Sequence, residues 1–201
     1  MQIFPRSLSP LLLVNDLGNT PLQPRQQRCF VPRMSTNSQL IENHGIIGNM
    51  RSAALIALDG TIDFYCFPSF DSPTVFAGLL DAEKGGFMSI EPQMEGIRHK
   101  QLYLPDTNIL LTRYLSDQGV AEVTDFMPVV EGTKRSAYAN QIIRMVRVIK
   151  GEVRFRVRCA PRFDYARSGH MACMEGDSIC FHPAKDGCPA CLLYTSPSPR
   201  D

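Results

Sequence analysis

Two short apolar runs, 52–58 and 61–66, stand on either side of Asp59-Gly60 and constrain the fold more than any other feature of the chain. Asp-Gly between apolar runs favours a two-residue type I′ turn, because both central residues of that turn need positive φ angles. The sequence therefore predicts a β-hairpin whose two antiparallel strands meet at residues 59 and 60.

The same hairpin determines the neighbours of one carboxylate. With a two-residue turn, Leu55 lies opposite Phe64 and Ile56 lies opposite Asp63. Asp63 would then stand among apolar side chains, where burial of an unpaired carboxylate is costly. We therefore expect Asp63 to have a partner, either Arg51 or a group from another domain.

Strand patterns continue along most of the chain. Further strands are predicted at 87–91, 99–104, 108–115, 120–127, 141–150 and 152–159. The last of these alternates strictly between apolar residues and arginines, as a half-buried strand does. The only predicted helix is Ser72–Asp81, where Pro73 suits a first helical turn. Evenly spaced strands with Gly, Asp and Pro turns favour a mainly-β fold with little helix, a sandwich of antiparallel sheets.

Both ends of the chain differ from its middle. Residues 1–33 are rich in proline and poor in acidic residues, and we interpret them as a leader or transit-like segment without ordered structure ahead of Met34. Residues 191–201 match the translation of a sequencing-adapter oligonucleotide, and we interpret them as an adapter-derived tail. The remaining residues, 34–190, amount to one domain, which we expect to be truncated.

Composition excludes several classes of protein. The formal net charge of the 201 residues is +1, which argues against a dedicated nucleic-acid or membrane-surface binder. No stretch approaches the roughly 18 apolar residues of a membrane-spanning helix. Seven cysteines without regular spacing indicate reduced thiols rather than a disulfide framework. We therefore expect a cytoplasmic protein, or an organellar one if residues 1–33 are a transit peptide.

Motifs for metal or cofactor chemistry are weak. Cys188-Pro-Ala-Cys191 has the spacing of half a zinc site or of a redox pair, but no second cysteine pair accompanies it and His182 stands at an unhelpful distance. The four histidines show no ligand pattern, and we expect them at solvated loop or edge positions. The sequence therefore predicts no metal, no cofactor and no catalytic residue within the chain.

A basic run near the end of the chain has two interpretations. It comprises Arg144, Arg147, Lys150, Arg154, Arg156, Arg158 and Arg162. Such a run can form an anion-binding or nucleic-acid-binding patch. Proteins that bind nucleic acid usually add stacking aromatic residues or flexible basic tails, and neither is evident. We favour a solvated sheet face, or one that docks on an acidic partner domain.

Five ordered stretches resemble one known family. They are 41–51, 59–73 with Val75-Phe76, 103–110, 120–128 and 159–167. Across about 41–166 the chain resembles the amino-terminal domain of glycoside hydrolase family 15, the glucoamylase and trehalase-like enzymes. One departure is Phe64-Tyr65, where the family often has Trp-Leu; the chain has no tryptophan that could stack on a sugar.

The resemblance implies an antiparallel β-supersandwich, incomplete here, that precedes an α-helical (α/α)6 barrel in the whole enzyme. Two glutamates of that barrel would hydrolyse α-glucosidic bonds of starch-type oligosaccharides or trehalose with inversion. One carboxylic acid protonates the leaving oxygen while the other carboxylate activates water, which requires roughly 6.5–9.5 Å between them. Neither glutamate falls within this chain, so we expect the chain by itself to be inactive.

Loops that extend from a rigid scaffold commonly carry functional contacts. We therefore expect five residues to dock the barrel and to rim its active-site mouth: Asp63, Phe70, Asp71, Arg162 and Asp164. The alternative is that Asp63 and Arg162 are internal partners within the sandwich. Two other functions stay open, a stand-alone carbohydrate-binding or interaction module and an anion-binding domain that uses the arginine-rich strand.

Overall fold

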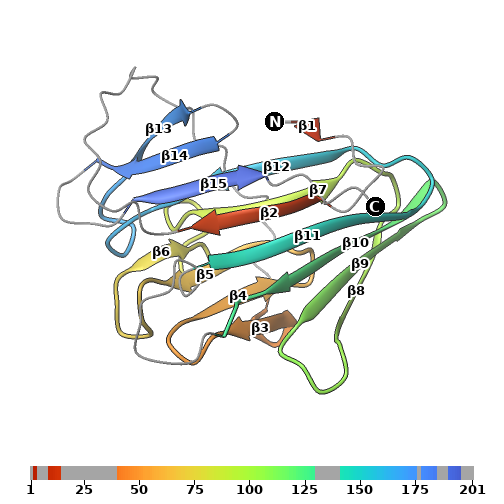
Figure 1. Ribbon diagram of the computed structural model, residues 1–201, viewed down its shortest axis with the longest axis horizontal. Coiled ribbons are helices and arrows are strands. Elements are labelled where there is room, and N and C mark those ends of the chain that lie inside the picture. Colours follow the sequence, from red (N-terminus) through yellow and green to blue (C-terminus); the bar gives the residue numbers. More distant parts are fainter. Residues whose placement is uncertain are drawn as a thin grey trace.

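Two antiparallel sheets make up most of this computed structural model, which describes residues 2–3, 9–14, 40–129, 141–175, 178–184 and 190–195 (Figure 1). Sheet A runs in the order β1 (Gln2–Ile3), β12 (Phe155–Ala160), β7 (Phe87–Pro92), β5 (Ile62–Cys66), β4 (Ala53–Ala57) and β3 (His44–Gly48), with β6 (Thr74–Ala77) paired to β5. Sheet B runs in the order β13 (His170–Glu175), β14 (Ser178–Pro183), β15 (Cys191–Thr195), β2 (Ser9–Val14), β11 (Gln141–Lys150), β10 (Gly119–Phe126), β9 (Leu110–Ser116) and β8 (Arg98–Tyr103). Helix is limited, among the described residues, to a 3-10 turn at Ile41–Asn43. The predicted mainly-β sandwich with little helix is confirmed.

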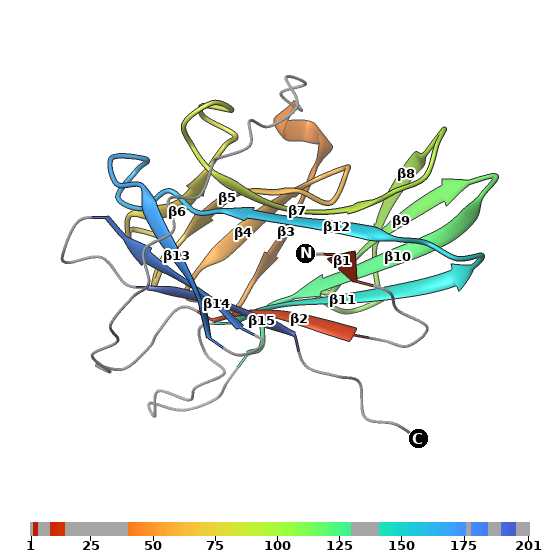
Figure 2. The same cartoon turned by 90° about the horizontal axis from the view of Figure 1, so that it is seen from above.

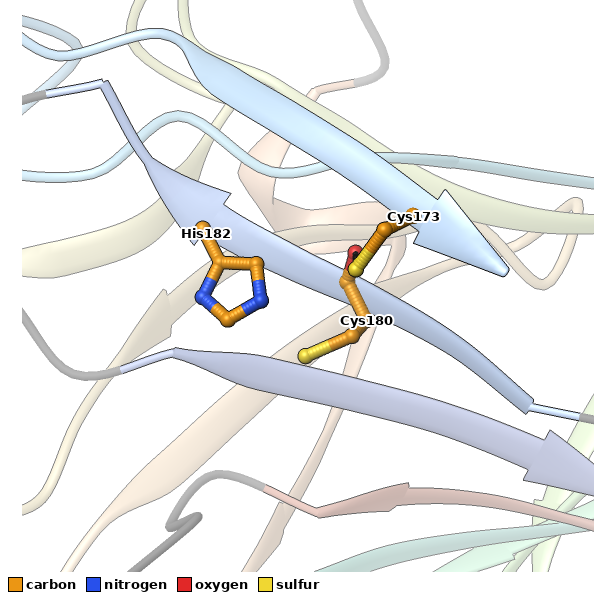
Figure 3. A group of neighbouring side chains, drawn as sticks. All are labelled: Cys173, Cys180 and His182. Atoms are coloured by element: carbon orange, nitrogen blue, oxygen red, sulfur yellow. Dashed lines mark hydrogen bonds between the residues drawn. The ribbon is translucent and has the colours of Figure 1, made fainter. Parts of the chain in front are cut away.

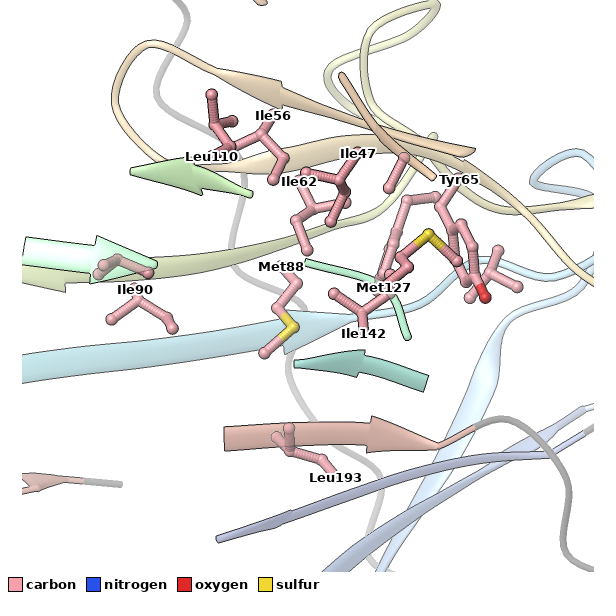
Figure 4. Close-up of a cluster of buried hydrophobic side chains, with 14 of the residues drawn as sticks. Ile47, Ile56, Ile62, Tyr65, Met88, Ile90, Leu110, Met127, Ile142 and Leu193 are labelled. Carbon is pink, nitrogen blue, oxygen red and sulfur yellow. The ribbon is translucent and has the colours of Figure 1, made fainter. Parts of the chain in front are cut away.

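The sheets lie face to face and enclose one core (Figure 2). Alternation along each strand selects the core side chains, because neighbouring residues point to opposite faces of a sheet. In β3, for example, Ile47 is fully buried whereas Ile46 is 52% exposed. Full burial of such a side chain stabilises the fold by roughly 1.5–3 kcal/mol. The core draws on both sheets and includes Ile47, Ile56, Ile62, Tyr65, Met88, Ile90, Leu110, Ile142 and Leu193 (Figure 4).

The hairpin of β4 and β5 is present, but its turn differs from the predicted one. Ala57 N–H donates to the Thr61 carbonyl at 2.8 Å, and Gly60 N–H donates to the Ala57 carbonyl at 2.8 Å. The loop therefore contains three residues, the last of which is Gly60 in the left-handed region with φ 83°. Ile56 consequently lies opposite Ile62, and the predicted pairing of Ile56 with Asp63 is wrong.

A β-bulge then restores the predicted pairing of Leu55 with Phe64. Asp63 is the extra residue in β5, between the positions that pair with Ile56 and Leu55. Bulges commonly re-aim a side chain. Here the bulge places Asp63 within hydrogen-bonding distance of His44 on β3.

The predicted helix at Ser72–Asp81 is wrong, because this segment contains strand β6 and the turns that follow it. All four residues of β6 are buried. The strand contains two β-branched residues and an aromatic one, Thr74, Val75 and Phe76, and such side chains fit a pleated surface better than a helix. Burial on both faces also exceeds what a surface helix with one apolar stripe would show.

Strands β7 to β12 fall in the six other predicted ranges, with ends that differ by a few residues. The alternation predicted for β12 is seen from Val153 to Arg156, where apolar residues are buried and arginines exposed, whereas the next three residues are all half-buried. β11 and β12 follow each other across Gly151 but lie in different sheets. Gly151 has φ 81° and passes so close to the Gln118 carbonyl that a Cβ would lie 2.6 Å from its oxygen.

Strands β1, β2, β3, β13, β14 and β15 were not predicted. β1 and β2 lie within the segment 1–33, and β15 lies within 191–201. β2 pairs with β11 on one side and with β15 on the other. The described parts of both end segments thus belong to the sheets, while their interpretation as leader and adapter stays a prediction.

Side chains close one side of the sandwich, where edge strand β3 meets edge strand β8. The Tyr103 hydroxyl accepts from Ile46 N–H at 2.8 Å and donates to the Ile46 carbonyl at 2.9 Å. The Asn108 amide donates to the Gly48 carbonyl at 2.9 Å. An open strand edge invites pairing with another chain, and these bonds occupy that edge. They also hold β3, which carries His44, against sheet B.

Among the described residues, no helix combines the length and the apolar character needed to cross a membrane.

Candidate functional site

His44 and Asp63 form a buried polar pair on the outer face of sheet A. His44 Nε2 lies 2.9 Å from Asp63 Oδ2, and the two side chains are 1% and 4% exposed. His44 shares its face of β3 with the exposed Ile46, which is why the pair lies outside the core. The expected partners, Arg51 or another domain, are therefore replaced by His44. His44 lies on an edge strand, as one of the two expected positions for the histidines has it, but its side chain is buried rather than solvated.

Hydrogen bonding limits the protonation states of the pair. His44 Nδ1 lies 3.0 Å from the Leu40 carbonyl oxygen, which can only accept. Nδ1 therefore carries a hydrogen, and Nε2 either accepts a proton from a neutral Asp63 or donates one to an ionised Asp63. One proton is thus shared between His44 Nε2 and Asp63 Oδ2.

Asp63 keeps unused hydrogen-bonding capacity. Burial raises the pKa of its carboxyl above the ordinary value, and the hydrogen bond with His44 offsets only part of that rise. Its Oδ1 atom is buried and has no hydrogen-bond partner among the described residues. Most buried polar atoms are partnered, so this oxygen is an exception that calls for a donor from outside the described residues.

Phe70 and Asp71 lie in the exposed loop between β5 and β6. Phe70 is 61% exposed, and its N–H donates to the Arg51 carbonyl at 3.0 Å. The Ser69 hydroxyl donates to Asp71 Oδ1 at 2.6 Å, which lowers the pKa of the Asp71 carboxyl. Backbone and side-chain bonds thus hold this loop while an aromatic ring faces solvent.

Arg162 and Asp164 lie in the segment that follows β12. Arg162 N–H donates to the Val75 carbonyl at 2.8 Å, which places Arg162 beside β6. Asp164 has a left-handed backbone with φ 53°, and its carboxylate lies 3.9 Å from Arg167 Nη1. Four of the predicted residues therefore lie in two segments that flank β6, whereas the Asp63 carboxylate points instead to His44.

The basic run contains a buried member. Arg144 and Asp125 side chains are 0% exposed, with Arg144 Nε 2.7 Å from Asp125 Oδ1. Arg158 pairs with Glu91 across β12 and β7 and lies over the Phe87 ring. The expectation of a solvated face is thus wrong for Arg144, which lies between the sheets. The exposed members Arg147, Arg156 and Lys150 still fit that expectation.

Three side chains could bind a metal ion: Cys173, Cys180 and His182. This group was not predicted from the sequence, because His182 was weighed only as a ligand beside the later Cys188-Pro-Ala-Cys191 pair. A usable signal was present, since Gly176-Asp177 is a turn pair and the two cysteines stand at equal distances on either side of it. Unless the pairing of β13 with β14 is known, the six residues that separate Cys173 from Cys180 do not match the spacing of a metal-binding motif.

Comparison with known proteins identifies relatives of most of the chain. The family model of trehalase-like N-terminal domains matches residues 31–192. A trehalase of Thermoplasma volcanium is 35% identical over 129 residues, which cover 63% of this chain and 20% of that protein. Trehalase 1 of Sulfolobus acidocaldarius is 36% identical over 158 residues, which cover 78% of this chain and 25% of that protein. A trehalase of Mycobacterium tuberculosis is 27% identical over 142 residues, with 64% and 21% covered.

The chain spans only a fifth to a quarter of the length of these curated relatives. No solved structure shows a significant match to it.

Proposed function

The chain belongs to the family of trehalase-like N-terminal domains, and from that premise we propose that it is the non-catalytic amino-terminal domain of an enzyme that hydrolyses an α-glucosidic bond. The family match over 31–192 carries this proposal. The relatives named above are all trehalases, which favours trehalose over starch-type oligosaccharides as the substrate of the whole enzyme. Glucoamylase activity is the alternative that the resemblance to glycoside hydrolase family 15 leaves open.

Catalysis would belong to a following α-helical barrel. In an inverting reaction an acid and a base lie on opposite sides of the sugar, roughly 6.5–9.5 Å apart, so that water can enter between them. Three acids of the sandwich are instead held by partners within it. Asp63 is bonded to His44, Asp125 to Arg144, and Asp71 to Ser69.

The role that we propose for the sandwich is to dock that barrel. Phe70 offers exposed apolar surface beside the ionised Asp71, and Arg162 and Asp164 lie on the other segment that flanks β6. Asp63 is too deeply buried to touch a partner with its paired oxygen. Its oxygen Oδ1 has no described partner but is buried as well, so a docked barrel would have to insert a donor beside it, with His44 holding the carboxylate in place.

The first test uses the complete coding sequence of the gene from which the chain derives. We expect the full-length product to release glucose from trehalose faster than from maltose, and the 201-residue chain to release none. Glucose release by this chain alone would contradict the proposal. A gene that ends close to this chain would instead favour a stand-alone carbohydrate-binding module, which sugar-binding calorimetry would then detect.

A second test addresses the docking surface in the full-length enzyme. Phe70→Ala should reduce trehalose turnover while leaving the unfolding midpoint of the sandwich nearly unchanged, because the ring faces solvent. Met174→Ala is the matched control, since Met174 is 78% exposed in β13, a strand of the other sheet. Equal activity of the two variants would remove Phe70 from the interface.

In the full-length enzyme, the Asp63→Asn variant distinguishes a role for Asp63 at the rim of the active-site mouth from a role inside the sandwich. A fall in turnover at unchanged melting temperature would support the rim role. A fall in melting temperature alone would leave Asp63 as an internal partner of His44.

We also propose that the protein works in the cytoplasm. The described cysteines Cys66, Cys159, Cys173 and Cys191 are free thiols, which supports a reducing compartment. A fluorescent fusion with and without residues 1–33 tests this proposal, because import that depends on those residues would point to an organelle.

A further inference from the structure

The hairpin of β13 and β14 brings sulfur and nitrogen donors to one face. Cys173 lies directly opposite Cys180 in the antiparallel register, and His182 is two residues beyond Cys180 on the same strand. Opposite residues of an antiparallel pair share a face of the sheet, as do residues two apart on one strand. Backbone register alone therefore places Cys173, Cys180 and His182 on the same side of the hairpin.

The side chains also converge. One ligand atom from each of the three residues lies within 4.8 Å of the other two. In Figure 3, His182 and Cys180 project from one strand, and the Cys173 sulfur points toward Cys180 from its neighbour. The Cys180 side chain is fully buried, whereas Cys173 and His182 are half-buried, so the group is reachable from solvent on one side.

We propose that Cys173, Cys180 and His182 form a binding site for a thiophilic divalent metal ion, with Zn²⁺ as the best fit. Two thiolates and one imidazole are a donor set that Zn²⁺ prefers. Bond lengths near 2.3 Å to sulfur and 2.0–2.1 Å to nitrogen require the donors to lie roughly 3.5–3.8 Å apart. A contraction of about 1 Å from the observed separation is within reach of side-chain rotation on a fixed backbone.

The chemistry of binding is balanced by the release of protons. Both thiols lose a proton to solvent as two thiolates and one neutral imidazole surround the ion, so affinity rises with pH until the thiols are ionised. The present hydrogen bond from the Cys173 thiol to the Cys180 carbonyl, at 3.6 Å, would then be given up. Water fills the fourth position of the tetrahedron.

The site would reinforce an edge of the fold. β13 is the last strand of sheet B and has β14 as its neighbour there. One ligand comes from β13 and two come from β14, so a bound ion would link the edge strand to the next. A metal that binds only the folded hairpin stabilises it by mass action. This inference concerns a structural role and does not depend on the proposed hydrolase.

The test titrates the full 201-residue chain with Co²⁺ and then Zn²⁺ in the presence of a non-thiol reductant. We expect one equivalent of Co²⁺ to give a thiolate-to-cobalt charge-transfer band, Zn²⁺ to displace it, and the unfolding midpoint to rise. Cys173→Ser, Cys180→Ser and His182→Gln should each weaken binding by at least about 100-fold, since even loss of a group that only supports a ligand costs roughly 10–100-fold.

Met174→Ala on the same hairpin and Cys66→Ala in β5 are the matched controls, and both should bind as the unchanged chain does. A second measurement uses the unchanged chain, so that the proposal can still be tested if a ligand variant fails to fold. In the unchanged chain, Zn²⁺ should slow alkylation of Cys173 and Cys180, mapped by mass spectrometry, without affecting Cys159. Absence of the charge-transfer band, equal alkylation with and without Zn²⁺, or a Cys173–Cys180 disulfide that persists in reductant would each overturn the proposal.

Discussion

The sandwich contains two buried pairs of a base and a carboxylate, and they differ in how completely their hydrogen bonds are satisfied. Between the sheets, Arg144 Nε and Nη2 contact the two Asp125 oxygens at 2.7 and 3.1 Å. Arg144 also donates to the carbonyls of Gly60 and Met88, which belong to sheet A and the turn beside it. On the outer face, His44 contacts one oxygen of Asp63 and leaves the other without a described partner.

This difference indicates that the two chemically similar pairs have different roles. The Arg144–Asp125 pair uses both carboxylate oxygens and reaches across the core, so it cross-links sheet B to sheet A. The His44–Asp63 pair positions a carboxylate and keeps one acceptor available. A fully satisfied buried network specifies one arrangement of a core, while a partly satisfied one carries a cost that a ligand or partner domain can relieve.

The largest expected effect comes from breaking the inner pair. Arg144→Ala should lower the free energy of unfolding by about 3–5 kcal/mol, because it leaves Asp125 buried without a counter-charge. Urea unfolding followed by fluorescence or circular dichroism measures this change. The control is the double variant Arg144→Met with Asp125→Leu, which removes both charges and should cost much less. Equal costs for the single and double variants would contradict the cross-link.

A smaller effect is expected at the outer pair. His44→Ala should lower the free energy of unfolding by about 1–3 kcal/mol, the cost of leaving a buried polar group without its partner. Ile46→Ala, two residues along the same strand and 52% exposed in the unchanged chain, is the control and should change stability little. A cost for His44→Ala as large as that for Arg144→Ala would remove the distinction between the pairs.

The smallest effect is a dependence on pH at Asp63. Because the pKa of Asp63 is raised in the folded chain, its contribution to stability is present at low pH and is lost as the pH rises through that pKa. Asp63→Asn cannot ionise, so its melting temperature should improve relative to the unchanged chain as the pH rises above 3.8, the ordinary value.

Melting curves of both proteins from acid to neutral pH measure this difference. The Ile46→Ala variant, which removes no titratable group, should show no such relative shift near the same pH. A difference between Asp63→Asn and the unchanged chain that stays constant with pH would show that Asp63 is ionised equally in the folded and unfolded states.

Local patterns predicted the strands well and their connections less well. The ranges around β7 to β12 followed from alternation and turn residues, which depend on neighbours in sequence. Asp59-Gly60 identified the hairpin correctly, but the same pair also suits a three-residue loop, and the Tyr114 hydroxyl that donates to the Asp59 carbonyl at 3.1 Å comes from sheet B. The helix expected at Ser72–Asp81 failed because burial on both faces of β6 depends on contacts from other strands.

Polar partners were the hardest part of the candidate site to predict. Phe70 and Asp71 lie on an exposed loop as expected, because Ser, Pro and Asp mark such a loop in the sequence. His44 was missed as the partner of Asp63, since β3 showed no strong strand pattern and a bulge changed the direction of Asp63. The metal-binding group was missed for the same reason, because ligands on two strands become neighbours only after the register is known.

By itself, the sequence determined that this protein is a β-sandwich. Alternation of apolar residues and the presence of turn residues are local signals that span a few positions, and they predict strands whichever register those strands pair in. It also determined which family the domain resembles, through ordered stretches of residues. Only the tertiary structure decided that Arg144 pairs with Asp125, that His44 holds Asp63, and that Cys173, Cys180 and His182 meet. Each of these contacts joins different strands, and a shift of one residue in pairing would turn the side chains to opposite faces.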